Sequence, residues 1–551
     1  MFTVFFLSFL IVITTVPFSK ILINDNQNTF YSYSKELIFG IVFLTFIALL
    51  LNFFIELNIY VTSTVLLISL TFLIKFRNCY FNKTFIVFSI LQSIFITTLI
   101  LESNVYRPDA GLYHLPYIGI LNSEKILIGV SNIHFRYGHT SIIQYLSAIH
   151  NNLINLDNGI VFAQALVASS VTLSFFYQLK NYSKLQNYDF HFYYLLFTSI
   201  YIAYKMNRYS EYGNDAPAHF LFFYLISEII IFRNNFSNKE YLNQLILTFF
   251  IISNKITLIP ILLFNLVGLK KINIKKFFPN KKFFILVIFL FIWLFKNILT
   301  SGCLVYPIKQ LCFDELLWTD INTIEKVGIS SEAWTKGISD IENNNILEKE
   351  FIKKFNWLEA WFSKHFIHVV KVLFPYLLFL FLIFSILSFY KEKKLAKVES
   401  VYLTYIVLSL LTVLFWFFKA PLYRYGYSLI ITFISLVAAH RVFRFSYNLN
   451  FMNKFSNIII FLCISIMVSK NIIRIVKNDN AYFNYPWPKY YSMSKNNYKS
   501  SNRSLSLNGI NLSEPEKGGY CMYSKSICAH YGSNDNLDVM RKNNYLIIYS
   551  K

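Results

Sequence analysis

The stretch Tyr106-Arg-Pro-Asp-Ala-Gly-Leu-Tyr-His-Leu-Pro116 is the first polar sequence after four long apolar runs. It contains a carboxylate, a guanidinium, an imidazole and two phenols. Pro108 favours the first turn of a short helix, and an acid after it suits the positive end of that helix. Such a helix places Asp109 and Tyr113 on one face. The stretch is therefore either a solvated loop or a site where Asp109 accepts a proton from a hydroxyl or binds a divalent metal.

The apolar runs around this stretch predict an all-α, polytopic membrane protein. Only 15% of the residues are charged, against about a quarter in soluble domains. The runs are continuous, which excludes the alternating pattern of a membrane β-barrel. We expect about fourteen transmembrane helices: Phe2–Phe18, Leu37–Ile55, Leu57–Phe76, Thr84–Leu101, Asn158–Gln178, Asp189–Met206, Asp215–Phe232, Leu242–Asn254, Ile256–Leu269, Phe283–Leu299, Phe366–Phe389, Val401–Lys419, Tyr425–Phe443 and Phe455–Ile475.

These runs divide the chain into three parts. We expect N-terminal transmembrane helices at 1–101, and a transmembrane core at 102–475 that carries outer loops at 102–157 and 300–365. A tail follows at 476–551. The first run lacks a basic flank and a clear small-residue cleavage site, so we interpret it as a retained helix and not a signal peptide.

The distribution of Lys and Arg predicts the topology. The formal net charge is +22, but no Arg-rich stripe or RNA-binding signature is present, so the charge does not indicate nucleic-acid binding. The cations collect between apolar runs, as expected for cytoplasmic loops. Four such loops all lie on the cytoplasmic side if Leu242–Leu269 crosses the membrane twice. This topology places both termini and the Asp109 loop outside. They contain Lys75, Arg77 and Lys83; Lys270, Lys271, Lys275, Lys276, Lys281 and Lys282; Lys391, Lys393, Lys394 and Lys397; and Arg441 and Arg444.

Four of the six cysteines lie in two close pairs on the predicted outer side. Cys303 and Cys312 share the loop at 300–365, and Cys521 and Cys528 share the tail. Both pairs fit local disulfides in an oxidising compartment. Cys79 and Cys463 are expected to be isolated thiols, and no Cys/His grouping has the spacing of a zinc site.

Further polar residues gather at the outer ends of the predicted helices. Asp215 opens a helix either as a cap or, with His219 on the same face, as part of a charged cluster. Cations should be depleted on an outer face, so those found there need a reason. They are either interface anchors or ligands for an anion such as a lipid phosphate or pyrophosphate. They are Arg107, Arg136 (followed by His139), Arg208, Lys255, Lys296 and Arg424.

The order of these motifs resembles the GT-C superfamily of integral-membrane glycosyltransferases, which includes protein mannosyltransferases and lipid A aminoarabinose transferases. Asp109-Ala-Gly-Leu-Tyr-His-Leu-Pro116 looks like the acidic first-loop motif of that family. Asn214-Asp-Ala-Pro-Ala-His-Phe220 is similar to its acid-Ala-Pro helix start, and Asn254-Lys255 to a Thr-Lys pair between two short helices. Phe295-Lys-Asn-Ile-Leu-Thr-Ser-Gly-Cys-Leu-Val-Tyr-Pro307 resembles an Arg-Asn…Tyr-Pro segment of bacterial members. A group of poorly characterised bacterial inner-membrane proteins also shares the Tyr-His-Leu-Pro motif.

The resemblance implies transfer of a sugar from a polyprenyl-phosphate donor at the outer face, by an inverting displacement. Asp109 would be the base or a metal-binding acid, with Tyr113, His114 and Asp215 in the catalytic group. The implied substrate-binding residues are the six outer cations with His139 and His219. The chain departs from the family in having three extra helices before Thr84 and a single acid in the first-loop motif.

From the sequence we therefore expect a bacterial inner-membrane glycosyltransferase with its active site on the periplasmic side. Its expected partners are the bilayer, a polyprenyl-phosphate-sugar donor and a glycan, lipid or protein acceptor. A divalent metal at Asp109 is the one cofactor that the motifs suggest. The alternatives are a flippase or transporter of a polyprenyl-linked glycan, a glycan polymerase or ligase, and a non-catalytic assembly protein. No P-loop, Gly-x-Gly-x-x-Gly motif or nucleophile elbow points to ATP, nicotinamide or serine-hydrolase chemistry.

Overall fold

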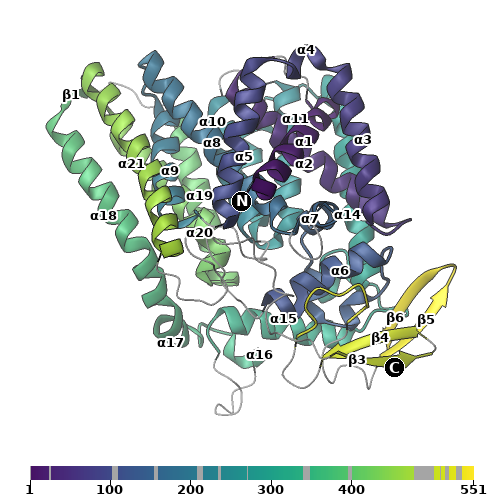
Figure 1. Ribbon diagram of the computed structural model, residues 1–551. Helices are drawn as coiled ribbons and strands as arrows, with labels where there is room; N and C mark the ends of the chain where they lie inside the picture. Colours follow the sequence, from purple (N-terminus) through teal and green to yellow (C-terminus); the bar gives the residue numbers. More distant parts are fainter. Residues whose placement is uncertain are drawn as a thin grey trace.

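The computed structural model describes residues 2–23, 27–101, 109–153, 159–207, 215–233, 237–269, 271–338, 348–394, 400–476, 502–508, 510–515, 520–528 and 537–551. Long helices packed side by side form most of the molecule (Figure 1). Within these ranges, nine helical segments are long and apolar enough to cross a membrane. The chain is therefore a mainly α-helical protein of the multi-pass membrane type.

Each of the fourteen predicted apolar runs overlaps a helix in the described part of the chain. They correspond to α1 (Phe2–Thr15) with η1 (Val16–Ile21), α2 (Phe30–Asn52), α3 (Ile59–Lys75), α5 (Lys83–Leu101), α8 (Phe162–Leu185), α9 (Phe190–Lys205), α10 (Asp215–Ile231), α11 (Asn238–Asn254), η6 (Ile256–Ile261) with α12 (Leu262–Leu269), α14 (Lys281–Ser301), α18 (Ile367–Phe389), α19 (Ser400–Lys419), α20 (Tyr423–Phe443) and α21 (Leu449–Val476). Fourteen crossings stay a prediction, since only nine segments have the length and hydropathy of a span.

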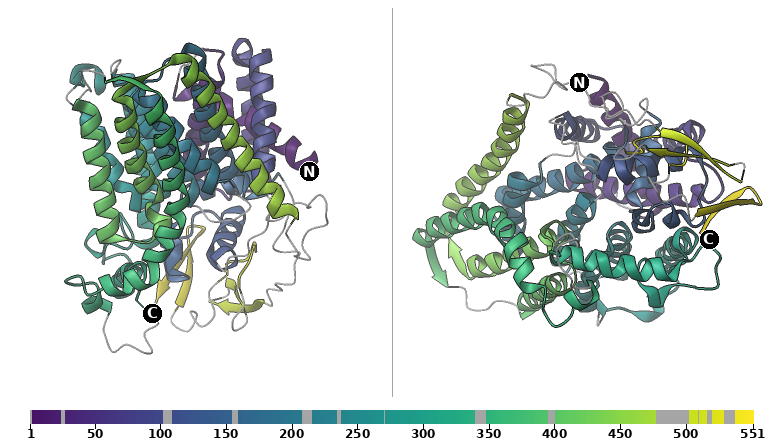
Figure 2. Two further views of the ribbon diagram at one scale, coloured as in Figure 1. Left: turned by 90° about the vertical axis from the view of Figure 1, so that its left-hand side faces the viewer. Right: turned by 90° about the horizontal axis from the view of Figure 1, so that it is seen from below.

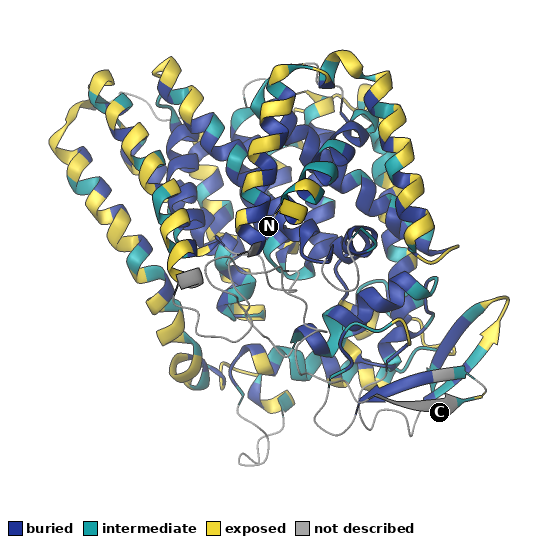
Figure 3. Cartoon of the chain, viewed as in Figure 1, coloured by how far each residue is buried: buried dark blue, intermediate teal, exposed yellow. Residues whose placement is uncertain are grey.

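The three central helices α9, α10 and α11 have only 16 or 17 residues each. Their side chains are almost all buried by neighbouring helices, whereas the outer faces of α3, α18 and α21 are exposed and apolar (Figure 3). An exposed apolar surface of this extent fits a protein surrounded by lipid. The helices before residue 101 share one hydrophobic core with the rest, and Phe46 stacks on Phe289 with ring centroids 4.0 Å apart.

The loops with most of the basic residues lie at one end of the bundle. The short helix α4 (Arg77–Tyr80) and the strand β1 (Lys391–Lys394) are at the top in Figure 1. β1 pairs with β2 (Phe445–Tyr447) at this end, and α13 (Ile274–Phe277) also lies in a predicted inner loop. The loops predicted from their Lys and Arg residues to share one side of the membrane therefore lie at the same end of the bundle.

The opposite end contains the segments predicted to be outside. They are η2 (Ala110–His114), α6 (Leu115–Ser123), η3 (Val130–Asn132), η4 (Phe135–His139), α7 (Ile143–Asn151), η7 (Lys309–Leu311), α15 (Ile321–Thr335), α16 (Glu348–Phe351), α17 (Leu358–Trp361) and η9 (Phe362–Phe366). Figure 2 shows the tail beside them at the same end. All residues of α7 are buried within the protein.

The tail contains strands that the all-α prediction did not include. β3 (Asn502–Leu507) pairs with β4 (Ile510–Pro515), and β5 (Leu537–Lys542) pairs with β6 (Tyr545–Ser550), both antiparallel. The second hairpin turns at Asn543 and Asn544, which both have positive φ, as a two-residue hairpin turn requires. Such turns tolerate Asn in the left-handed region, so the Asn-Asn pair was a usable signal for this hairpin.

Both predicted disulfides are present. Cys303 is bonded to Cys312 in the loop at 300–365, and Cys521 to Cys528 in the tail. Cys79 and Cys463 are free thiols, as expected. The first bridge belongs to a small separate core with Tyr306 and Ile324.

Candidate functional site

Asp109 lies directly before a single π-helical turn, η2, and not in the ordinary α-helical turn that the sequence predicted. The next helix, α6, has Pro116 at its second position. In a continuous α-helix the proline ring would clash with the carbonyl four residues earlier. The wider turn avoids this clash, and the Leu115 N–H donates to the Ala110 carbonyl five residues back. The Asp109 side chain is left 32% exposed at the start of the turn.

Two arginines from distant parts of the chain approach the Asp109 carboxylate. Arg136, in η4, has its Nη1 atom 3.9 Å from Oδ1. Arg424, in the first turn of α20, has its Nη1 atom 3.7 Å from Oδ2. Arg136 also covers the ring of Tyr113 at 4.9 Å. The structure thus brings together the first-loop acid, its aromatic neighbour and two of the predicted cations.

A second acid–base pair is adjacent to the first. Lys255, directly after α11, donates a short hydrogen bond to the carboxylate of Asp215 at the start of α10. The Lys255 side chain is 7% exposed and that of Asp215 is 44% exposed. Lys255 lies 4.1 Å above the ring of Tyr425, whose hydroxyl accepts a 3.2 Å hydrogen bond from Arg424. Tyr425 therefore connects the two pairs.

His114 is influenced by the charged groups of both pairs. Burial lowers the pKa of His114 to about 4, with Asp109 and Asp215 acting to raise it and Arg136 and Arg424 to lower it further. The imidazole is therefore neutral at neutral pH. Burial also raises the pKa of the Tyr113 phenol, so that Tyr113 keeps its proton. Both groups can offer neutral hydrogen bonds beside the charged pairs.

His219 is buried between α10 and α20. Its Nδ1 atom lies 2.6 Å from the Ser428 hydroxyl, and its Nε2 atom lies 3.1 Å from the backbone carbonyl of Arg424. The ring holds the first turn of α20 against α10. This geometry supports the position of Arg424 and gives His219 no exposed surface for a ligand.

Lys296 and His139 lie to one side of the cluster. Lys296 is fully buried in α14 and donates a 2.6 Å hydrogen bond to the Thr140 hydroxyl. His139 is exposed and meets the ring of Tyr306 edge-on at 5.0 Å. The two remaining predicted cations, Arg107 and Arg208, lie outside the described residues.

These residues up to Arg424 lie within a stretch that matches one protein family. The model of that family, described as a domain of unknown function (DUF8201), matches residues 1–431. The chain belongs to the DUF8201 family. No curated protein and no solved structure matches the chain. The tail lies beyond the part that matches DUF8201.

Two aromatic residues of the site in this DUF8201 chain were not predicted from the sequence. Trp334, in α15, lies 5.3 Å from the guanidinium of Arg424. Its position in the long loop at 300–365 gave no signal of this contact. Tyr425 directly follows Arg424 in the sequence, and aromatic residues next to a surface Arg are common enough that its contact with both pairs was not evident.

The donor set does not fit a resident divalent metal. Both oxygens of Asp109 face guanidinium groups, and Asp215 accepts from Lys255. In the described part of the chain, no three His, Cys, Asp or Glu residues are grouped closely enough to bind a metal ion. Hard cations need several oxygen ligands, and the oxygens of Asp109 and Asp215 are already paired with cationic side chains.

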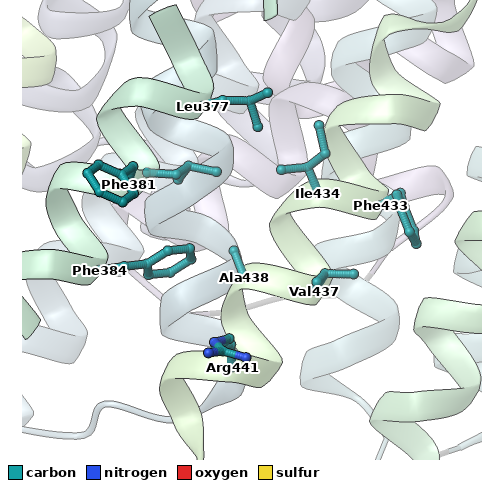
Figure 4. A pocket seen from close by; sticks show the side chains of 9 residues that line it. Leu377, Phe381, Phe384, Phe433, Ile434, Val437, Ala438 and Arg441 are labelled. Carbon is teal, nitrogen blue, oxygen red and sulfur yellow. The ribbon is translucent and has the colours of Figure 1, made fainter. Parts of the chain in front are cut away.

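An apolar groove of 330 Å³ lies between α18 and α20, well along α20 from Arg424. Figure 4 shows side chains of α18, such as Phe381, opposite Ile434 of α20, with Arg441 at one end. None of its lining residues belongs to the cluster around Asp109. We therefore treat the cluster as the candidate site.

Proposed function

We propose that the protein is a glycosyltransferase of a bacterial plasma membrane, which transfers a sugar from a polyprenyl-phosphate donor to a cell-envelope acceptor. The observation that carries the proposal is the position of the Asp109 carboxylate between Arg136 and Arg424, beside the Asp215–Lys255 pair. A base and phosphate-binding cations are the two chemical elements that such a transfer needs.

The arginines are arranged to bind a further anion. Their distances to Asp109, 3.7 and 3.9 Å, are ion-pair contacts beyond hydrogen-bond length. The Nη2 atom of Arg424 already donates to the Tyr425 hydroxyl. The donors proposed for phosphate oxygens are therefore the Nη1 groups of both arginines, which face Asp109 without a close hydrogen bond to it. Such bonds would stabilise the charge that develops on the leaving phosphate.

Asp109 is the base in this proposal. It would take the proton of the acceptor hydroxyl as the acceptor oxygen forms its bond to the sugar C1 and the bond from C1 to the phosphate oxygen breaks. Tyr113 and His114, both neutral, would hydrogen-bond sugar or acceptor hydroxyls. Asp215 is held by Lys255 and so serves to position that lysine and Tyr425 beside the phosphate site.

We propose that the chain crosses the membrane fourteen times, with the cluster around Asp109 and the tail on the periplasmic side. It is supported by the grouping of basic loops at the opposite end of the bundle. A polyprenyl donor of this kind is presented in the outer leaflet, where its phosphate would meet the ends of α10, α11 and α20.

The test is Asp109→Asn, which keeps the shape of the side chain and removes the base. In membranes supplied with polyprenyl-phosphate sugars, release of polyprenyl phosphate should fall by about 10²–10⁴-fold. Asp314→Asn is the matched control, because Asp314 is an exposed acid in the loop at 300–365. Turnover of Asp109→Asn above a tenth of the wild-type rate would refute the proposed base. Release of polyprenyl pyrophosphate instead would indicate the polymerase or ligase alternative.

A further inference from the structure

The loop closed by the Cys521–Cys528 disulfide lies directly against the turn that carries Asp109. The Met522 N–H donates a 2.9 Å hydrogen bond to the Gly111 carbonyl. The Tyr523 hydroxyl donates a 3.2 Å hydrogen bond to Asn122 at the other end of α6. Met522 and both cysteines are buried. The tail therefore contacts η2 and α6 through backbone and side chain.

Two residues that could donate to the Gly111 carbonyl within a helix do not do so, which gives the Met522 contact its importance. In this turn the Leu115 N–H donates its hydrogen bond to the Ala110 carbonyl. The next residue along, Pro116, has no N–H to offer. A buried carbonyl without a partner is costly, and the Met522 N–H provides the missing hydrogen bond.

Two glycines allow the tail to come this close. A Cβ atom on Gly111 would lie 2.5 Å from the Met522 sulfur, and one on Gly119 would lie 1.9 Å from the Ser524 carbonyl oxygen. Met522 itself has a φ of +56°, in the left-handed region that side chains other than Gly seldom occupy. A non-glycine residue persists in that region only where its surroundings impose it, and here the seven-residue disulfide spacing and the Gly111 contact do so.

We infer that the Cys521–Cys528 loop positions Asp109, so that the site is competent only while this disulfide is closed. The inference on the turn itself stands on the contacts above, and its consequence for turnover rests on the proposed function. Both phosphate-binding arginines are on other elements, η4 and α20. Opening the loop therefore frees the turn that carries Asp109 to move. The two arginines keep their positions, because η4 and α20 do not depend on this contact.

The β5–β6 hairpin of the tail is held by contacts that do not involve this disulfide. The Ile548 N–H donates to the Ile128 carbonyl at 2.9 Å, and the Ile128 N–H donates to the Leu546 carbonyl at 3.0 Å. The Tyr545 hydroxyl donates to the Phe53 carbonyl at 2.9 Å. These contacts hold the β5–β6 hairpin in place when the disulfide is broken, so the effect of opening the loop stays local.

The first experiment measures hydrogen–deuterium exchange of the peptide at 109–117 in the full-length protein in nanodiscs. Exchange should be at least tenfold faster in the Cys521→Ser/Cys528→Ser variant and unchanged in the Cys303→Ser/Cys312→Ser control. Gly119→Ala should give the same increase with all cysteines present, since it displaces the Ser524 carbonyl. Unchanged exchange in both the Cys521→Ser/Cys528→Ser and Gly119→Ala variants would overturn the inference.

The second experiment measures turnover. Dithiothreitol gives two electrons and two protons to the disulfide, which becomes two thiols while the reductant becomes a cyclic disulfide. In the Cys303→Ser/Cys312→Ser chain, reduction should lower kcat at least tenfold, reoxidation should restore it, and KM for the donor should change less than threefold. The Cys521→Ser/Cys528→Ser chain should have the low kcat throughout. If kcat is the same with the Cys521–Cys528 bond closed, reduced or removed, the proposed dependence of turnover on this disulfide is wrong. Faster exchange at 109–117 in a protein with no transferase activity would refute the proposed function alone.

Discussion

Removing either partner of the Asp215–Lys255 pair should lower the stability of the protein by different amounts. Lys255 is almost completely buried, with a 7% exposed side chain, whereas 44% of the Asp215 side chain is exposed. Asp215→Asn removes the charge that compensates a buried ammonium. Lys255→Met removes the buried charge itself and leaves a carboxylate that water can solvate. We therefore expect Asp215→Asn to destabilise the protein more.

The magnitudes follow from the burial of each partner. Breaking a fully buried pair by removing one partner costs about 3–5 kcal/mol. Because 44% of the Asp215 side chain is exposed to solvent, the pair is partly screened. We therefore expect Asp215→Asn to lower the free energy of unfolding by about 2 kcal/mol. Lys255→Met loses a cation–π contact with Tyr425 of about 1 kcal/mol, but a methionine sulfur packs well against the same ring. Its net cost should be about 0–1 kcal/mol.

The assay compares apparent unfolding midpoints in one detergent at one scan rate, because unfolding of a chain of this size is governed by rates as well as equilibrium. The double variant Asp215→Asn/Lys255→Met is the control. It should match Lys255→Met, since the asparagine then has no buried charge beside it. If Lys255→Met lowers stability more than Asp215→Asn by over about 1 kcal/mol, the reasoning from burial is wrong.

Three further predictions concern other parts of the chain. Since the pKa of His114 is lowered from 6.5 to about 4, the unfolded chain binds a proton in this window that the folded chain does not. Stability should therefore fall by about 1–2 kcal/mol as the pH drops from 6.5 to 4, allowing for partial exposure, and a His114→Gln variant that keeps the same pH profile would contradict this. In intact cells expressing cysteine-free chains, an impermeant thiol reagent should label Asn322→Cys and not Asn273→Cys; the reverse would invert the topology. A Cβ on Gly40 would lie 2.3 Å from the Thr15 carbonyl oxygen, so Gly40→Ala should cost about 1–3 kcal/mol, and an unchanged melting temperature would exclude this close contact.

The helices were predictable because each apolar run is long enough to identify on its own. Their ends were less predictable where polar residues are buried. The helix predicted to start at Leu37 begins at Phe30, because Lys35 is paired with Glu228 and Glu240 inside the bundle. Local hydropathy reports how polar a residue is and carries no information about a distant partner, so such a turn looks like a loop in the sequence.

The members of the site were predictable for a different reason. Acids and cations at the predicted outer helix ends stood out because that side should contain few cations, and this reasoning identified Asp109, Arg136 and Arg424. It did not determine their pairing. Which residues meet depends on how each helix is rotated and packed in the bundle, and the same reasoning also included Lys296, which is buried against Thr140 instead.

The charged groups at the two ends of the bundle differ in a way that bears on function. At the basic end, Lys20 and Glu36 are 2.6 Å apart and each side chain is only 2% exposed. A pair so close and so shielded has its charges satisfied internally and holds helices together. At the other end, Arg136 and Arg424 are 34% and 41% exposed and stay beyond hydrogen-bond length from Asp109. Exposed pairs at such distances contribute little stability, which supports the proposal that the two arginines serve as donors for an anionic ligand.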